Sequence, residues 1–186
     1  MAQRSAFRPP LAQPLGGPNV FPKNVRYGDI VKGLPVPDSS ADGVYASHIL
    51  EHLSLEDCRI ALRNTFRMLK SGGTFRLVVP DLASLVRFYL ARVERGDPES
   101  CHWLMRVTDL GLERRQRGLK SLIIAAFGNS KHCWMWDAQS LSTELERVGF
   151  VEIRRWEFGD SPDKLFNLVE EKLRIDGGCA LEARKP

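Results

Sequence analysis

The sequence predicts an α/β domain whose mainly parallel sheet is covered by helices on both faces. Short apolar runs of strand length alternate along the chain with longer segments in which apolar residues recur at helical spacing. Glycine and proline residues punctuate the boundaries between many of these segments. Strands that alternate with helices are typical of a layered sheet with parallel strands. At 186 residues, the chain is long enough for one such domain.

Five segments have the pattern of strands. Each is a short run containing apolar or β-branched residues and bounded by turn or polar residues. They are 24–27, 43–46, 75–79, 151–156 and 179–183. A long stretch of chain joins the last two segments, so we expect the final strand to be antiparallel and to lie at an edge of the sheet.

Helical spacing marks the segments between these strands. Ser54 and Asp57 form a capping-box pattern, and the helix behind them is expected to end at Gly72-Gly73. Further helices are expected at 82–95, within most of 97–130, and at 137–148. The expected inner face of the helix at 82–95 consists of Leu85, Phe88, Tyr89 and Val93.

The N-terminal part of the chain differs in composition from the rest. Seven of the eleven prolines lie within the first 37 residues, so we interpret 1–24 as an irregular arm and 25–186 as the domain. Residues 1–33 also carry five basic side chains and one acidic one, which leaves the remainder neutral although the whole chain has a net charge of +4. A basic arm alone does not favour nucleic-acid binding.

Composition also limits the cellular setting. Hydrophobic residues make up 43% of the chain, yet no apolar run is long enough to cross a membrane, and the N-terminus lacks the apolar core of a secretory signal. The four cysteines are far apart and form no C-x-x-C pair, which favours reduced thiols over a disulfide framework. We therefore expect a cytoplasmic protein without membrane contact.

Polar side chains follow three of the expected strands. They are Asp29, then Ser47-His48 with Glu51-His52, and then Asp81 after Pro80. Open parallel sheets bind ligands beyond the carboxyl ends of their strands, so these residues predict a crevice for a polar small molecule. A simpler interpretation stays open for each of them: the aspartates can cap turns, and the histidines can be structural.

Three longer stretches carry a resemblance to a known family. The run GDIVKGLPVPDSSADGVYASHILEHL at 28–53 and the run ALRNTFRMLKSGGTFRLVVPD at 61–81 resemble the middle of class I S-adenosylmethionine (SAM)-dependent methyltransferases of the type 11 group. The run HCWMWDAQSLSTELERVGFV at 132–151 and the ending LEARKP are similar to the later motifs of a bacterial subgroup. The resemblance implies a Rossmann-like sheet of seven strands, with the last strand antiparallel, and SAM as the cofactor.

Roles for individual residues follow from this resemblance. Asp29 would bind the adenine amino group and Ile30 would pack on the ring, while Ser47 and His52 would lie beside the methionine part of SAM. His48 and His132 are the candidate bases, because imidazole titrates near neutrality; His132 can equally be a packing residue at the start of a helix.

A metal site is not expected from the sequence. Glu51-His52 is similar to a pair that binds a divalent cation in some quinone-type O-methyltransferases. His48 stands where the further acidic ligand is expected.

One departure from the family pattern concerns the cofactor loop. The glycine-rich loop after the first strand is missing or degenerate, since only Gly16-Gly17 in proline-rich surroundings precedes Asp29. Three explanations of this departure stay open. The gene model begins too late and omits the cofactor loop, the domain is shortened and no longer binds the cofactor, or a partner chain completes the sheet. An uncovered strand edge favours aggregation, so we expect residues 1–24 or a second protomer to lie against it.

The function expected from the resemblance is SAM-dependent methyl transfer to a small molecule or a glycan. The alternative from another class is a catalytically silent module of the same fold that binds a ligand or another subunit. Modification of nucleic acid is a third option that rests only on the basic arm.

Overall fold

The fold is built on one four-stranded sheet. The computed structural model describes residues 26–113 and 131–186, and the sheet order is β1-β2-β4-β3. The strands are β1 (Ala41–Ser47), β2 (Leu69–Pro80), β3 (Val151–Arg155) and β4 (Gly178–Arg184). β1 pairs with β2 in parallel, and β4 pairs antiparallel with both β2 and β3. Three strands therefore point one way, and the α/β class with an antiparallel last strand is confirmed.

The last strand is not at an edge, contrary to one expectation. β4 lies between β2 and β3, so β3 and β1 are the outer strands of the described sheet. The burial of the two strands agrees with this strand order. Six of the seven β4 residues are buried or half-buried, whereas four of the five β3 residues are exposed. The most apolar strands thus occupy the centre, where both faces are covered.

β2 begins earlier than its sequence pattern indicates. The preceding helix ends at Met68, and the chain is extended from Leu69 onward. The two glycines that were expected to end the helix lie inside the strand, because Gly72 N–H donates to the carbonyl of Lys185 and Lys185 N–H donates to the carbonyl of Gly73. The C-terminal segment thus pairs with the N–H of Gly72 and the carbonyl of Gly73.

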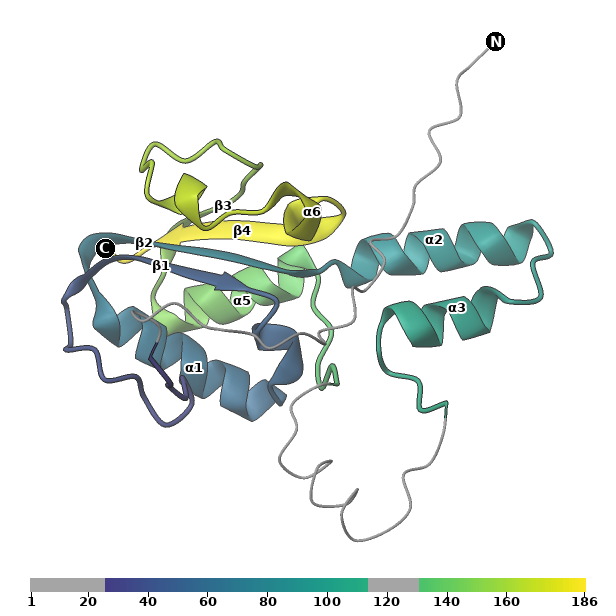
Figure 1. Cartoon of the computed structure of the whole chain (residues 1–186), viewed down its shortest axis with the longest axis horizontal. Helices are drawn as coiled ribbons and strands as arrows, with labels where there is room; N and C mark the ends of the chain where they lie inside the picture. The colour runs from purple at the N-terminus through teal and green to yellow at the C-terminus, as the bar shows by residue number, and fades with distance from the viewer. Residues whose placement is uncertain (1–25, 114–130) are drawn as a thin grey trace, which may run out of the picture.

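Two helices cover one face of the sheet (Figure 1). α1 (Leu55–Met68) begins at Ser54, whose hydroxyl accepts from Asp57 N–H, as the capping pattern predicts. α5 (Ala138–Val148) begins at a capping box of Asp137 and Ser140. The main core lies between these helices and the sheet and includes Leu62, Leu77, Leu141, Leu145, Phe150 and Leu181.

The other face is covered by the chain between β3 and β4. It contains the short helices η2 (Phe166–Leu168) and α6 (Lys172–Ile175), and α6 lies on the opposite side of the sheet from α5 (Figure 1). Under this segment, Arg76 of β2 is fully buried and forms ion pairs with Asp160, Glu170 and Glu182. Its guanidinium lies 3.9 Å from the ring centroid of Trp156. A buried charge network therefore joins this segment to the sheet.

Two helices project from the end of the sheet. α2 (Leu82–Glu94) and α3 (Ser100–Val107) pack on each other beyond the carboxyl end of β2 (Figure 1). Phe88 and Val93, expected on an inner face, are 41% and 47% exposed. That prediction was wrong because α2 does not lie on the sheet, and Phe88 instead packs on Trp103 with ring centroids 5.8 Å apart.

The segment before β1 also differs from the prediction. Residues 26–28 form no strand, and Asp29 is in a turn that bridges back to Gly33. Among residues 26–113 and 131–186, no strand pairs with the outer edge of β1. The arm at 1–24 and the second half of the region at 97–130 lie outside the described residues, so the expected cover of that edge stays a prediction. No helix in the described part is long and apolar enough to span a membrane.

Candidate functional site

The candidate site lies where β1 and β2 end at the same edge of the sheet. Ser47, the last residue of β1, is opposite Val78 of β2. His48 N–H then donates to the carbonyl of Val78, which extends the pairing by one residue. His48 has a φ of +53°, a left-handed conformation that turns the chain out of the strand. The helix η1 (Leu50–His52) follows directly.

The His48 side chain joins this turn to two other parts of the molecule. Its Nδ1 lies 3.0 Å from Oε1 of Glu51, and its Nε2 lies 2.9 Å from the carbonyl oxygen of Arg174 in α6. Burial of the ring opposes its charge, but the hydrogen bonds to Glu51 and to the Arg174 carbonyl outweigh it and raise the pKa of His48. Both partners offer acceptor oxygens, so both ring nitrogens of His48 are already engaged within the protein.

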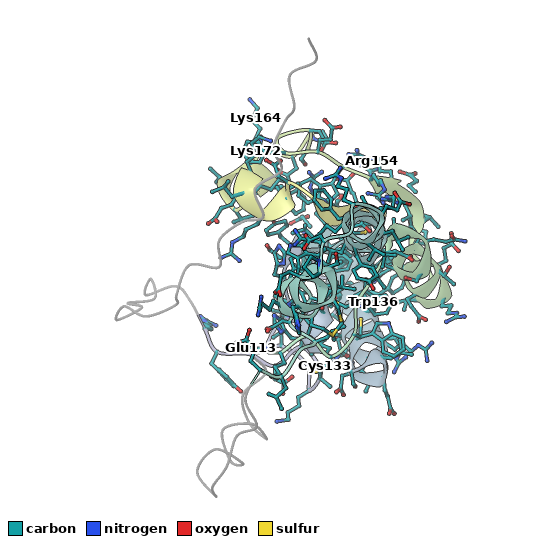
Figure 2. The ribbon with its side chains drawn as sticks, turned by 90° about the vertical axis from the view of Figure 1, so that its right-hand side faces the viewer. Glu113, Cys133, Trp136, Arg154, Lys164 and Lys172 are labelled. Carbon is teal, nitrogen blue, oxygen red and sulfur yellow. The ribbon has the colours of Figure 1, made fainter. Side chains whose placement is uncertain are left out.

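Glu51 anchors the loop at 131–137 to this edge. Its carbonyl oxygen accepts from Cys133 N–H at 2.7 Å and from Trp134 N–H at 3.1 Å. Further along, Leu82 N–H donates to the carbonyl of Trp136, which is fully buried. The loop at 131–137 therefore crosses the carboxyl ends of β1 and β2. Figure 2 shows its Cys133 and Trp136 on the side of the body away from Lys164 and Lys172.

An imidazole of this loop, His132, lies against the imidazole of His52 in η1. The rings of His52 and His132 lie 4.9 Å apart at an interplanar angle of 62°. Nδ1 of His52 is 3.1 Å from the carbonyl of Lys131, and Nδ1 of His132 is 2.8 Å from the carbonyl of Thr108. Together with Glu51, they place three candidate ligand atoms within 4.8 Å of one another. The sequence offered no reason to pair His132 with His52, because the two lie far apart along the chain.

The aspartates have the capping roles that the sequence left open. Asp81 is buried at the N-terminus of α2, where it accepts from Ala83 N–H at 3.1 Å and from the Ser84 hydroxyl at 2.8 Å. Asp29 accepts from Val31 N–H at 3.0 Å, and this hydrogen bond lowers the pKa of its carboxyl.

The expected convergence of Asp29 with the other strand ends is not seen. The carbonyls of Ile30 and Val31 accept from Asn64, far along α1 from its start beside η1, so the Asp29 turn lies away from the carboxyl edge.

A cavity of about 470 Å³ lies at the same edge of the sheet, on the α6 side. Gly178, the first residue of β4, is opposite Pro80, the last residue of β2, and lines this cavity. Its mouth carries both signs of charge, from Arg155 and Lys172 and from Glu157 and Asp176. None of Asp29, Ser47 and Asp81 is among its lining residues in the described chain.

The two buried cysteines are not candidate nucleophiles. All four are unpaired, as expected. Burial raises the pKa of Cys58 and of Cys179 to about 12, so neither thiol ionises near neutral pH.

Comparison with protein families gives one match, to the family described as "Methyltransferase domain". Residues 11–77 match this methyltransferase family. The methyltransferase match covers less than half of the chain, and it contains β1, η1, α1 and most of β2. The resemblance to type 11 methyltransferases is confirmed over this segment, which includes Ser47, His48, Glu51 and His52. Asp81 and His132 lie outside it.

Solved methyltransferases are similar to this chain at low identity. A methyltransferase from Haloferax volcanii, in complex with a methyltransferase activator, has 18% identity and a TM-score of 0.47 over 86% of this chain and 60% of its own. A SAM-dependent methyltransferase from Archaeoglobus fulgidus has 18% identity and a TM-score of 0.47 over 87% and 67%. This chain thus spans about three fifths of the first structure's length. Comparison with curated proteins gave no match.

Proposed function

We propose that this protein transfers a methyl group from SAM to a small molecule or a glycan. The observation that carries the proposal is the methyltransferase match at residues 11–77, because the matched segment contains the turn from Ser47 to His52 at the carboxyl edge of the sheet. In open sheets that edge is where ligands bind. A methyltransferase needs little more than a site that holds donor and acceptor in line, since proximity and orientation supply most of the rate.

Roles for the residues follow from the same match. Ser47 and His52 are proposed to contact the methionine part of SAM. Asp29 and Ile30, which the resemblance assigned to the adenine, lie away from this edge and are not part of the proposed site. Of the two candidate bases, His132 is the better supported. Within the described residues its Nε2 has no hydrogen-bond partner, whereas both nitrogens of His48 already contact acceptors.

Binding of SAM to the full chain tests the proposal directly. Isothermal titration with SAM and with S-adenosylhomocysteine should give saturable heat below about 1 mM, the upper end of ordinary substrate affinities. Ser47→Ala should weaken binding. The matched control is Ser71→Ala, at the opposite end of the sheet. No heat from folded protein at millimolar ligand would overturn the proposal and favour the silent module.

A second experiment tests the acceptor class. The full chain is incubated with methyl-labelled SAM and separate fractions of small molecules, glycans, protein and RNA. Label in the small-molecule or glycan fraction is expected. Label confined to protein or RNA would keep the activity and overturn the proposed acceptor.

A further inference from the structure

We propose that Glu51, His52 and His132 bind a divalent transition-metal ion, with Zn²⁺ as the best fit. Their candidate ligand atoms lie within 4.8 Å of one another, and Glu51 is fully buried while the two histidines are half-buried. The site goes beyond methyl transfer, and its existence does not depend on that activity. His132 is the decisive residue, because it comes from a loop distant in sequence and points its ring at a pair in η1.

Hydrogen bonds leave one nitrogen of each imidazole free for a metal. A backbone carbonyl can only accept, so Nδ1 of His52 donates to Lys131 and Nδ1 of His132 donates to Thr108. Each neutral ring then has its lone pair on Nε2, for which the described residues provide no partner. Metal-bound histidines almost always donate their other N–H in this way, and the donation fixes the ring orientation.

Glu51 supplies an independent indication of a cation site. Its Oε1 is held by His48 at 3.0 Å, but its buried Oε2 has no hydrogen-bond partner among the described residues. A buried carboxylate oxygen without a partner is costly. The two hydrogen bonds to its own carbonyl hold the Glu51 backbone in place, and the residue has no exposed surface. A cation between this oxygen and the two imidazoles would remove the cost.

The ligand types select the ion. Two imidazoles and one carboxylate favour Zn²⁺ and its neighbours in the first transition row, whereas Mg²⁺ and Ca²⁺ prefer oxygen alone. Three protein ligands leave the fourth position of a tetrahedral ion open for water or an acceptor oxygen. Bound ligand atoms lie about 3.3 Å apart in such a site, so binding should draw the three side chains together.

Metal binding and base catalysis exclude each other at His132. A metal on Nε2 uses the lone pair that a general base would need. A bound ion would instead lower the pKa of a water or acceptor hydroxyl in its open position, and thus replace the base. The two assignments of His132 can therefore be separated by experiment.

The test is a titration of the untagged, metal-free full chain with Zn²⁺. Isothermal titration in competition with a chelator should give one ion per chain. His132→Ala and His52→Ala should each lower the affinity by about tenfold or more, at least the loss caused by removing a supporting residue. The matched control is His102→Ala, which removes an exposed histidine of α3 and should leave the affinity unchanged. Cys133→Ser should also leave it unchanged, because its thiol is not part of the cluster.

Two further readouts keep the test decisive if a variant fails to fold. Co²⁺ added to the wild-type chain should give the intense visible bands of a four- or five-coordinate ion with nitrogen ligands. Zn²⁺ should raise the melting temperature of the wild type and of the His102→Ala variant. The proposal is overturned by a weak octahedral Co²⁺ spectrum, by no Zn²⁺ binding, or by an affinity that falls in the Cys133→Ser or His102→Ala variant and not in His132→Ala.

Discussion

The buried network around Arg76 makes the strongest prediction about stability. Arg76 is fully buried, and its guanidinium pairs with Glu170 at 2.9 Å and with Asp160 at 2.9 Å, as well as with Glu182. Glu170 is also fully buried as a side chain, so Arg76→Met leaves a carboxylate without its cation inside the protein. Loss of one partner of a buried pair costs about 3–5 kcal/mol. The contact with Trp156 adds to this, so we expect a loss near the top of that range.

Urea unfolding at neutral pH measures this loss. Glu170→Gln combined with Arg76→Met should recover part of the stability, because the double variant buries no unpaired charge at that pair. The matched control is Arg67→Met, since the pair of Arg67 with Asp38 is more than half exposed on both sides and should cost below about 1 kcal/mol. A single Arg76→Met variant within about 1 kcal/mol of the wild type would refute the reasoning, given the cost of a broken buried pair.

Two further predictions concern the helices on the other face. Ser54→Ala removes the hydroxyl that accepts from Asp57 N–H and should cost about 1 kcal/mol in urea unfolding, whereas Thr143→Ala on the exposed side of α5 should cost less. The hydrogen bond from Arg59 to Glu144 outweighs the opposing effect of burial and lowers the pKa of the Glu144 carboxyl in the folded state. The Glu144 carboxylate therefore contributes its full stabilisation above the pKa that this carboxyl has in the unfolded chain. The contribution is lost as the pH falls through the lower pKa of the folded state. The stability difference between wild type and Glu144→Gln, measured by urea unfolding from about pH 6 to pH 3, should shrink toward acid; a constant difference would contradict this.

Local signals predicted much of the fold. The capping pattern at Ser54 and the start of α5 after Asp137 follow from hydrogen bonds between residues three apart, which the sequence displays directly. The buried run at 75–79 and the antiparallel last strand follow from apolar pattern and connection length. The features of the fold that these local signals did not reveal depend on contacts between residues far apart in sequence. Gly72 and Gly73 lie within β2 because Lys185 pairs with them from the other end of the chain.

The same distinction explains Arg76. Arg76 is charged within an otherwise apolar run, and nothing local shows that the chain between β3 and β4 covers it. That chain supplies Asp160 and Glu170, which lie more than 80 residues from Arg76 in sequence. A sequence pattern records which residues share a face, but not what later packs on that face.

The candidate site shows why geometry adds to the family match. His48 holds a left-handed conformation that a non-glycine residue adopts only when its surroundings compensate. Here the compensation comes from Val78, Glu51 and the Arg174 carbonyl, which hold the end of β1 from the neighbouring strand, from η1 and from α6. One oxygen of Glu51 is used in this support, and the other has no hydrogen-bond partner among the described residues. The histidine that looks like a base in the sequence thus has both ring nitrogens in contact with acceptors, and these contacts link the end of β1 to η1 and α6.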